Sequence, residues 1–129
     1  DGDFMQGNTA LWTASRYGIP ALIIASNNRS HFNDEVIQER IAGRRDRPRE
    51  NAWIGQRIAD PDIDLSAIAR AQRVEAAGPI ATLGELAPAL EKAFEVVEGG
   101  APYFLDLLVK QTESASSFSE SAKQGARQG

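Results

Sequence analysis

Two kinds of apolar pattern alternate along the chain. Apolar residues recur at helical spacing in four segments, residues 7–17, 34–42, 65–72 and 82–98. Short continuous apolar runs lie between or after them, at residues 20–26, 74–77 and 102–109. Runs without polar alternation are typical of strands covered on both faces, as in a parallel sheet. The pattern therefore predicts an α/β domain of three layers with a mostly parallel sheet.

Signals at the helix ends support this assignment. Asp64 is expected to cap the third helix, and Thr82 with Glu85 matches a capping box at the start of the fourth. Gly99 follows the last apolar position of that helix and favours its end there. Three aromatic residues in this part of the chain are predicted to lie in the core: Phe94, Tyr103 and Phe104.

Residues 43–61 follow neither pattern, and a loop of this length inside a compact domain is uncommon and often functional. Arginines are concentrated around its start: Arg40, Arg44, Arg45, Arg47 and Arg49. We interpret the Arg-rich stretch, residues 43–50, as a solvated loop with salt bridges to Asp46 and Glu50. Recognition of an anionic substrate is the alternative. Trp53 and Ile54 are predicted to anchor this loop to the core, or else to line the mouth of a site.

Composition narrows the function classes. The chain has 129 residues, enough for one domain, and its net charge of -4 gives no reason to expect nucleic-acid binding. It has no cysteine, which excludes disulfides, thiolate metal sites and a cysteine nucleophile. No apolar run approaches the roughly 20 residues of a membrane span, so we expect no membrane association and a cytoplasmic location. Residues 111–129 are polar and predicted to be a flexible tail.

Candidate chemistry lies at the ends of two predicted strands. Asp1-Gly2-Asp3 precedes the first helix, and Asn27-Asn28 follows the first apolar run. Ligands of α/β proteins bind at the carboxyl ends of parallel strands. Carboxylate and amide oxygens are hard ligands that suit Mg²⁺ on a phosphorylated cofactor, and Gly2 would let the backbone approach a phosphate closely. The two motifs together predict a Mg²⁺–diphosphate site.

These motifs resemble those of thiamine diphosphate enzymes of the acetolactate synthase and 2-oxoacid decarboxylase family. That family carries a Gly-Asp-Gly motif followed, at similar spacing, by an Asn-Asn pair. This chain reads Asp1-Gly2-Asp3-Phe4-Met5 and then Ser26-Asn27-Asn28-Arg29-Ser30, and residues 9–20 are similar to the family's helix-to-strand connection. The first glycine of the motif is absent, because the sequence starts at the aspartate. The resemblance covers residues 1–110 and implies a thiamine diphosphate-binding fold.

The resemblance also implies roles for individual residues. Asp1, Asn28 and the carbonyl of Ser30 would be Mg²⁺ ligands. Gly2 and Asp3 would offer backbone N–H groups to the diphosphate, and residues 31–35, beginning with His31, would border the thiazolium and the substrate. No residue of this chain is assigned as catalytic. For His31, catalysis is the alternative to a solvated side chain, and for Asp34 and Glu35 a proton relay is the alternative to acids that favour the helix dipole.

The function that the resemblance implies is decarboxylation of a 2-oxo acid followed by carboligation, as in acetolactate synthase. A thiamine diphosphate-dependent decarboxylase or carbon–carbon lyase is the alternative, and a non-catalytic α/β binding domain is another. The family's activating glutamate lies on a pyrimidine-binding domain that is not found here. We therefore expect residues 1–110 to be an N-terminally truncated C-terminal portion of a diphosphate-binding domain, inactive alone and working within a homodimer or tetramer.

Overall fold

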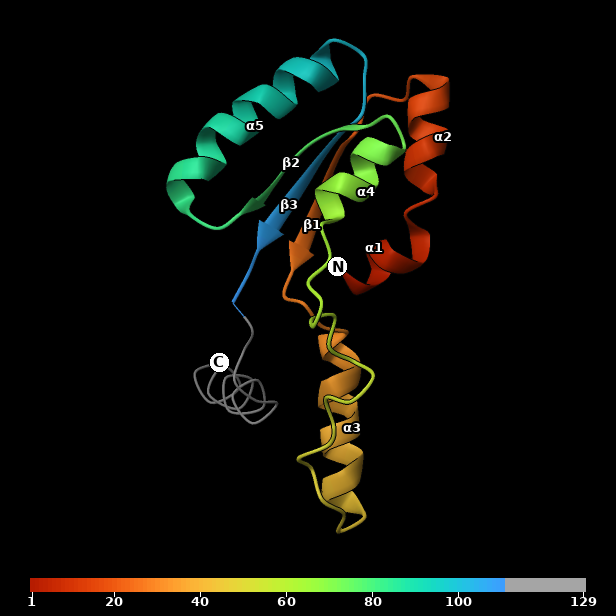
Figure 1. Cartoon of the computed structure of the whole chain (residues 1–129), viewed down its shortest axis with the longest axis vertical. Coiled ribbons are helices and arrows are strands. Elements are labelled where there is room, and N and C mark those ends of the chain that lie inside the picture. Colours follow the sequence, from red (N-terminus) through yellow and green to blue (C-terminus); the bar gives the residue numbers. More distant parts are fainter. Residues whose placement is uncertain (111–129) are drawn as a thin grey trace, which may run out of the picture.

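The computed structural model describes residues 1–110, which form five helices and three strands (Figure 1). In chain order these elements are α1 Gly2–Gly7, α2 Ala10–Tyr17, β1 Leu22–Asn27, α3 Phe32–Arg44, α4 Leu65–Ala71, β2 Glu75–Ile80, α5 Leu83–Glu98 and β3 Tyr103–Leu108. The predicted tail, residues 111–129, lies outside the described residues. The predicted alternation of helices and strands is confirmed.

The three strands form a parallel sheet in the order β1-β3-β2. The central strand, β3, is set beside β1 with Ala25 opposite Asp106 and Asn27 opposite Leu108. On the other side, Ala77 of β2 pairs with Leu105, and the register then shifts before Ile80. Because all three strands run the same way, their carboxyl ends meet at one edge of the sheet.

Helices cover both faces of the sheet, which confirms the predicted three layers (Figure 1). On one face α1, α2 and α4 pack around Phe104, whose ring centroid lies 4.7 Å from that of Phe4. On the other face α5 packs on Tyr103 and Leu105. Tyr103 and Phe104 are buried as predicted, but Phe94 is 54% exposed, so its assignment to the core is wrong.

Several predicted boundaries also need correction. The first helical segment begins at Gly2 rather than at residue 7, because the Asp1 side chain accepts the N–H of Gly2 and caps α1. A break around Asn8 then separates α1 from α2. The helix predicted at residues 34–42 extends over Phe32–Arg44, and the strand predicted at 74–77 runs over Glu75–Ile80. The Asp64 cap is confirmed, since its carboxylate accepts the N–H of Ala67.

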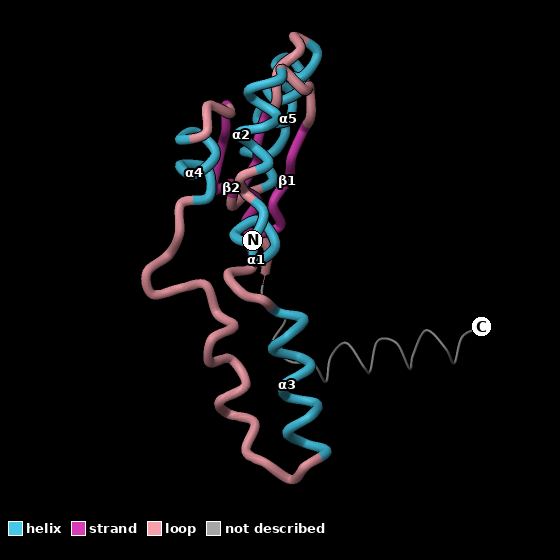
Figure 2. Tube along the Cα trace, turned by 90° about the vertical axis from the view of Figure 1, so that its right-hand side faces the viewer, coloured by secondary structure: helices cyan, strands magenta, loops and turns pink. Residues whose placement is uncertain are grey.

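Residues 32–57 project from the domain as an arm (Figures 1 and 2). The arm consists of α3, which has no buried residue, and a return segment that runs back along it. Trp53 and Ile54 are 44% and 57% exposed, so their predicted anchoring in the core is wrong. The salt bridges predicted to Asp46 and Glu50 do not occur among residues 1–110. Instead, the guanidinium of Arg49 lies across Gly43 of α3.

The capping box at α5 leads to a first prediction. Oε2 of Glu85 accepts the N–H groups of Ala81 and Thr82 and the Thr82 hydroxyl, at 3.0, 2.9 and 3.0 Å. These bonds, the one from Ala81 foremost, lower the pKa of Glu85. A carboxyl group with a lowered folded-state pKa stabilises the fold above its unfolded-state pKa, and this contribution is lost as pH falls through the folded-state pKa. Glu85→Ala should therefore destabilise the protein near neutral pH, and the difference should shrink in acid.

The measurement is urea unfolding of the wild type and Glu85→Ala near neutral pH and in acid. Glu91→Ala serves as the control, because Glu91 is exposed on the same helix outside the capping box. A Glu85→Ala effect that stays constant across this pH range would contradict the prediction.

Candidate functional site

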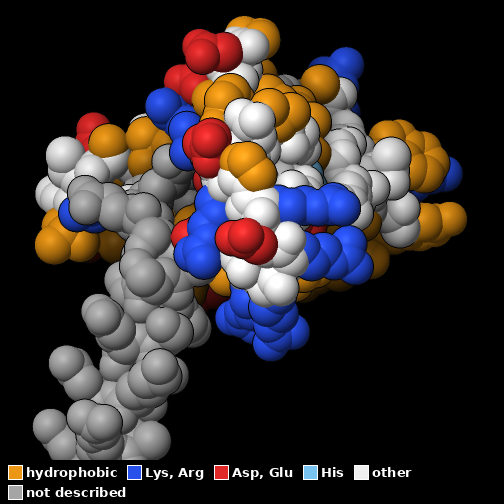
Figure 3. Space-filling view, turned by 90° about the horizontal axis from the view of Figure 1, so that it is seen from below, with side chains coloured by type: hydrophobic (Ala, Val, Ile, Leu, Met, Phe, Trp, Pro, Cys, Tyr) orange, Lys and Arg blue, Asp and Glu red, His pale blue; other side chains and the backbone are white. Residues whose placement is uncertain are grey.

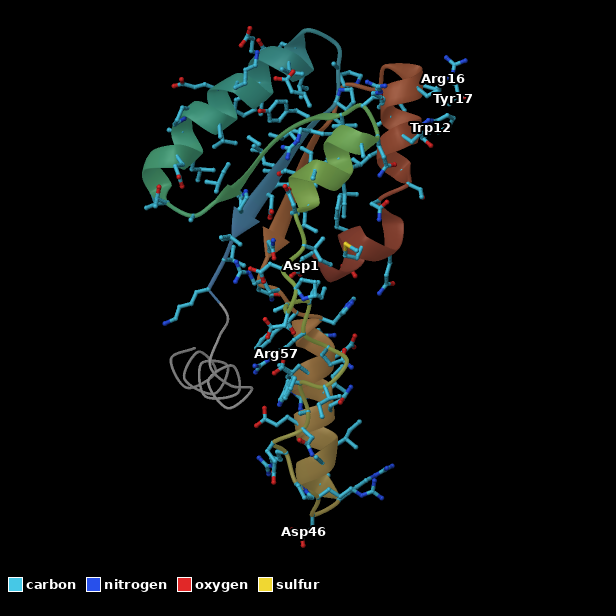
Figure 4. All side chains as sticks on the ribbon, in the orientation of Figure 1. Asp1, Trp12, Arg16, Tyr17, Asp46 and Arg57 are labelled. Carbon is cyan, nitrogen blue, oxygen red and sulfur yellow. The ribbon has the colours of Figure 1, made fainter. Side chains whose placement is uncertain are left out.

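The Asp1 carboxylate connects the first residue of the chain to the turn that follows β1. One oxygen, Oδ1, accepts the N–H of Gly2 at 2.9 Å, and the other, Oδ2, accepts the N–H of Ser30 at 3.0 Å. The backbone nitrogen of Asp1 donates to the carbonyl of Ser26 on β1 at 3.2 Å. Asp1 is therefore fixed beside the carboxyl end of β1 by its contacts with Ser26 and Ser30 (Figure 4).

The turn after β1 is held by the two asparagine side chains. Asn27 Oδ1 accepts the N–H of Arg29 at 3.1 Å, and Asn28 Oδ1 accepts the N–H of Ser30 at 3.0 Å. Such side-chain bonds to a backbone two residues ahead stabilise a turn. Arg29 adopts a positive φ of 60°, which lets the chain reverse here. As a result, Asp1 Oδ2 and Asn28 Oδ1 converge on one nitrogen atom, that of Ser30.

Ser30 also connects this cluster to the arm. The carbonyl of Arg29 accepts the N–H of Ile58, and the N–H of His31 donates to Gln56, which forms an antiparallel bridge between Ser30 and Arg57. These two bonds use backbone groups of Arg29 and His31 and leave those of Ser30 unused. The N–H of Ser30 donates to the Asp1 carboxylate.

Glu35 holds the base of the arm from within α3. The Ser30 hydroxyl donates to Glu35 Oε2 at 3.0 Å, and Arg57 pairs with Glu35 Oε1 at 3.3 Å. Arg57 also lies over the ring of Trp53, 5.2 Å from its centroid. Glu35 is thus more than a first-turn acid, because it connects the turn after β1 to both sides of the arm.

An open cleft of about 830 Å³ lies beside this cluster. Its lining includes Asp1, Gly2, Asp3, Asn28, Ser30 and His31. The imidazole of His31 packs directly on Gly2, so that a Cβ added at Gly2 would be only 2.6 Å from His31 Cε1. The structure thus brings all six sequence-predicted site residues to one cleft, and it places the N–H of Gly2 on the carboxylate of Asp1.

Asp106 belongs to none of the predicted site motifs, yet it lies in the middle of β3 and is 1% exposed. Burial raises the pKa of its carboxyl group, and a hydrogen bond from the Asn27 side chain acts in the opposite direction. Asp106 lines a second, smaller cavity of about 220 Å³ together with Asp1 and Asn27. The signal in the sequence was a single acid inside an otherwise apolar run, since such a residue needs a polar partner when buried.

The arginines predicted to gather in one stretch lie at the far end of the arm. Arg44, Arg45 and Arg47 are exposed there, and Asp46 marks the tip (Figure 4). Seen from below, Lys and Arg side chains occupy much of this end of the molecule (Figure 3). The arm thus holds these arginines away from the cleft, and none of them lines it.

Other site types find no support in residues 1–110. No group of three or more His, Cys, Asp or Glu residues in this part is arranged to hold a metal ion. This finding does not apply to a site made of one carboxylate, one amide oxygen and one backbone carbonyl, because only the carboxylate comes from a His, Cys, Asp or Glu residue. No helix among the described elements has the length and apolar character needed to cross a bilayer.

Comparison with known proteins identifies one family. Residues 1–107 match the model of the family described as thiamine pyrophosphate enzyme, C-terminal TPP binding domain. No curated protein and no solved structure matches the chain significantly.

Proposed function

The chain belongs to the thiamine pyrophosphate enzyme family, as the C-terminal TPP-binding domain, and from this premise we propose that Asp1, Asn28 and Ser30 bind the cofactor diphosphate through Mg²⁺. The observation that carries the proposal is the convergence of Asp1 Oδ2 and Asn28 Oδ1 on the Ser30 nitrogen, at 3.0 Å each. Two oxygens, one from the residue before α1 and one from the turn after β1, are thereby brought to one point at the carboxyl edge of the sheet.

The chemistry of these groups fits Mg²⁺. This ion prefers oxygen ligands and is usually bound by one or two carboxylates together with phosphate oxygens and water. Asp1 supplies a negative charge, Asn28 a neutral amide oxygen and Ser30 a backbone carbonyl. Hydrogen bonds hold the two side chains in place before any ligand binds, which reduces the ordering cost of binding.

The remaining residues of the cleft would position the cofactor. Gly2 carries no side chain between the cleft and the backbone, and His31 packs on it from the turn. We propose that the N–H of Asp3 faces the diphosphate and that His31 borders the thiazolium. The N–H of Gly2, the other group expected there, donates to Asp1 Oδ1 instead. When bound, thiamine diphosphate supplies the nucleophile and the electron sink for cleavage of a carbon–carbon bond. The chain itself would supply the Mg²⁺ ligands and the orientation.

For the reaction class, we propose decarboxylation of a 2-oxo acid with carboligation, similar to acetolactate synthase. A thiamine diphosphate-dependent decarboxylase or carbon–carbon lyase is the second candidate. Either reaction would take place with a pyrimidine-binding domain or subunit, in a homodimer or tetramer. Incubation of the intact protein with pyruvate separates the candidates. Acetolactate supports carboligation, acetaldehyde alone supports simple decarboxylation, and cofactor binding without any product supports a non-catalytic domain.

The cofactor site is tested by calorimetric titration of the intact protein with thiamine diphosphate. Binding should require Mg²⁺, and Asn28→Ala should weaken it by about tenfold, the lower end of the effects seen around protein metal sites. Asn51→Ala is the matched control, since Asn51 is an exposed amide on the arm. Binding that needs no Mg²⁺ and is unchanged in Asn28→Ala would refute the proposed site.

A further inference from the structure

The buried carboxyl group of Asp106 lies beneath the proposed cofactor site. On β3 it follows Phe104 on the face covered by α1, α2 and α4, and it pairs in register with Ala25 of β1. We propose that Asp106 is a positioning residue that acts through Asn27 on the turn carrying the Mg²⁺ ligands. This inference rests on the proposed function, because it concerns the same Mg²⁺ site.

The neighbours of Asp106 leave space for a carboxyl group in the middle of the sheet. Ala25 on one side is small, and Gly78 on the other has no side chain. A Cβ added at Gly78 would be 2.7 Å from Cβ of Asp106, so β2 and β3 are in close contact here. Asn27 lies two residues beyond Ala25, on the same face of β1. Its side chain is thus within reach of the carboxyl group from the neighbouring strand.

The amide of Asn27 has two ends with different partners. Its oxygen accepts the N–H of Arg29, so the amide nitrogen is the end that can donate to Asp106, which lines the same small cavity. A flip of this amide would direct an oxygen at the carboxylate of Asp106 and an NH₂ group at the N–H of Arg29. Asp106 therefore fixes the orientation in which Asn27 can hold the turn. Both side chains are nearly buried, with 6% exposure for Asn27 and 1% for Asp106.

The orientation of Asn27 is transmitted to the ligands through the backbone. The Asn27–Arg29 bond supports the positive φ of Arg29, a conformation that is unfavourable for a residue with a side chain. This conformation of Arg29 directs the N–H of Ser30 toward Asp1 and Asn28. The chain of contacts from Asp106 thus ends at the point where the two ligand oxygens converge.

One oxygen of Asp106 is sufficient for this role. Among the described residues, Oδ1 of Asp106 has no hydrogen-bond partner. The bond from Asn27 therefore uses the other oxygen. An asparagine at this position keeps one acceptor oxygen, whereas an alanine removes it. Asp106→Asn should therefore keep an acceptor for the Asn27 amide, whereas Asp106→Ala should lose it.

The test measures the Mg²⁺ concentration needed for half-maximal thiamine diphosphate binding by the intact protein. Asp106→Ala and Asn27→Ala should each raise it by about tenfold, as expected for groups that orient metal ligands. Asp106→Asn should restore the wild-type value to within about threefold, and the double variant Asn27→Ala/Asp106→Ala should be no worse than either single variant. Thermal unfolding of each variant shows that it is folded.

The outcomes separate this inference from the proposed function. If the wild type binds the cofactor without Mg²⁺, the proposed site itself fails. If Mg²⁺ is required but Asp106→Ala lowers only the thermal midpoint, or if the effects of the two alanine variants add, the positioning role is overturned. Should Asp106→Ala not fold, Asn27→Ala and Asp106→Asn carry the test. A Mg²⁺ requirement that is unchanged in Asn27→Ala, or raised tenfold in Asp106→Asn, then overturns the role.

Discussion

Asp1→Ala is expected to weaken Mg²⁺-dependent thiamine diphosphate binding by about a hundredfold or more, the largest functional effect that we predict. Groups that only orient metal ligands typically contribute 10–100-fold to metal affinity, and a charged ligand should contribute at least as much. Asp1 is the only carboxylate among the three proposed ligands, so its loss removes the one negatively charged protein group that would hold Mg²⁺ at the diphosphate. It also removes the acceptor for the N–H of Gly2 and one of the two acceptors for the N–H of Ser30.

The measurement is a Mg²⁺ titration at fixed thiamine diphosphate, with Asp1→Asn and Glu91→Ala in parallel. Asp1→Asn keeps an oxygen but not the charge, and its affinity should lie between those of the wild type and Asp1→Ala. Glu91→Ala removes an exposed carboxylate from α5 and should leave binding unchanged. An Asp1→Ala protein that is folded and has the wild-type Mg²⁺ midpoint would rule out Asp1 as a ligand.

Gly78→Ala should cause the largest loss of stability, about 3 kcal/mol or more. Gly78 has a φ of 127°, which residues with a side chain rarely adopt. The added Cβ would also lie 2.7 Å from Cβ and 3.1 Å from Cα of Asp106, on the central strand. Neither the backbone strain nor the clash can be relieved by moving a flexible side chain, since the obstacle is the backbone of β3.

The same substitution at another glycine provides the control. Gly84 lies in the first turn of α5, where an added Cβ would meet only the Thr82 hydroxyl, at 4.0 Å. Gly84→Ala should leave the protein as stable as the wild type or slightly more stable, because alanine favours helices over glycine by up to about 1 kcal/mol. Chemical unfolding of both variants measures the difference. Equal stability of Gly78→Ala and the wild type would contradict the strain observed at this position.

The layered fold could be predicted because its signals are local. The apolar run before Asn27 predicts β1, and the capping box at Thr82 and Glu85 fixes the start of α5 within one residue. The expectation that β1 is covered on both faces is wrong at Ile24, which is 47% exposed. Phe94 was misassigned because helical spacing alone does not define which side of a helix is buried. The buried side of α5 is centred on Ala93. Phe94 is the next residue along the helix, and its side chain is 54% exposed.

The candidate site could be predicted only in part. The carboxyl ends of parallel strands meet at one edge, so Asp1 and Asn28 could be expected to approach one another. The contribution of Glu35 depends on the arm turning back so that Arg57 reaches the base of α3, a tertiary contact without a local signal. The same holds for Asp106, whose partner Asn27 lies on a neighbouring strand 79 residues earlier in the chain.

The arm gives this fold a place where the chain can change in length. It leaves the domain after Ser30 and returns beside it at Arg57, so its two ends are already held together by the bridge between them. The entropic cost of closing a loop grows only slowly with its length. Insertions and deletions within the arm can therefore be accommodated while the sheet and the turn after β1 stay as they are.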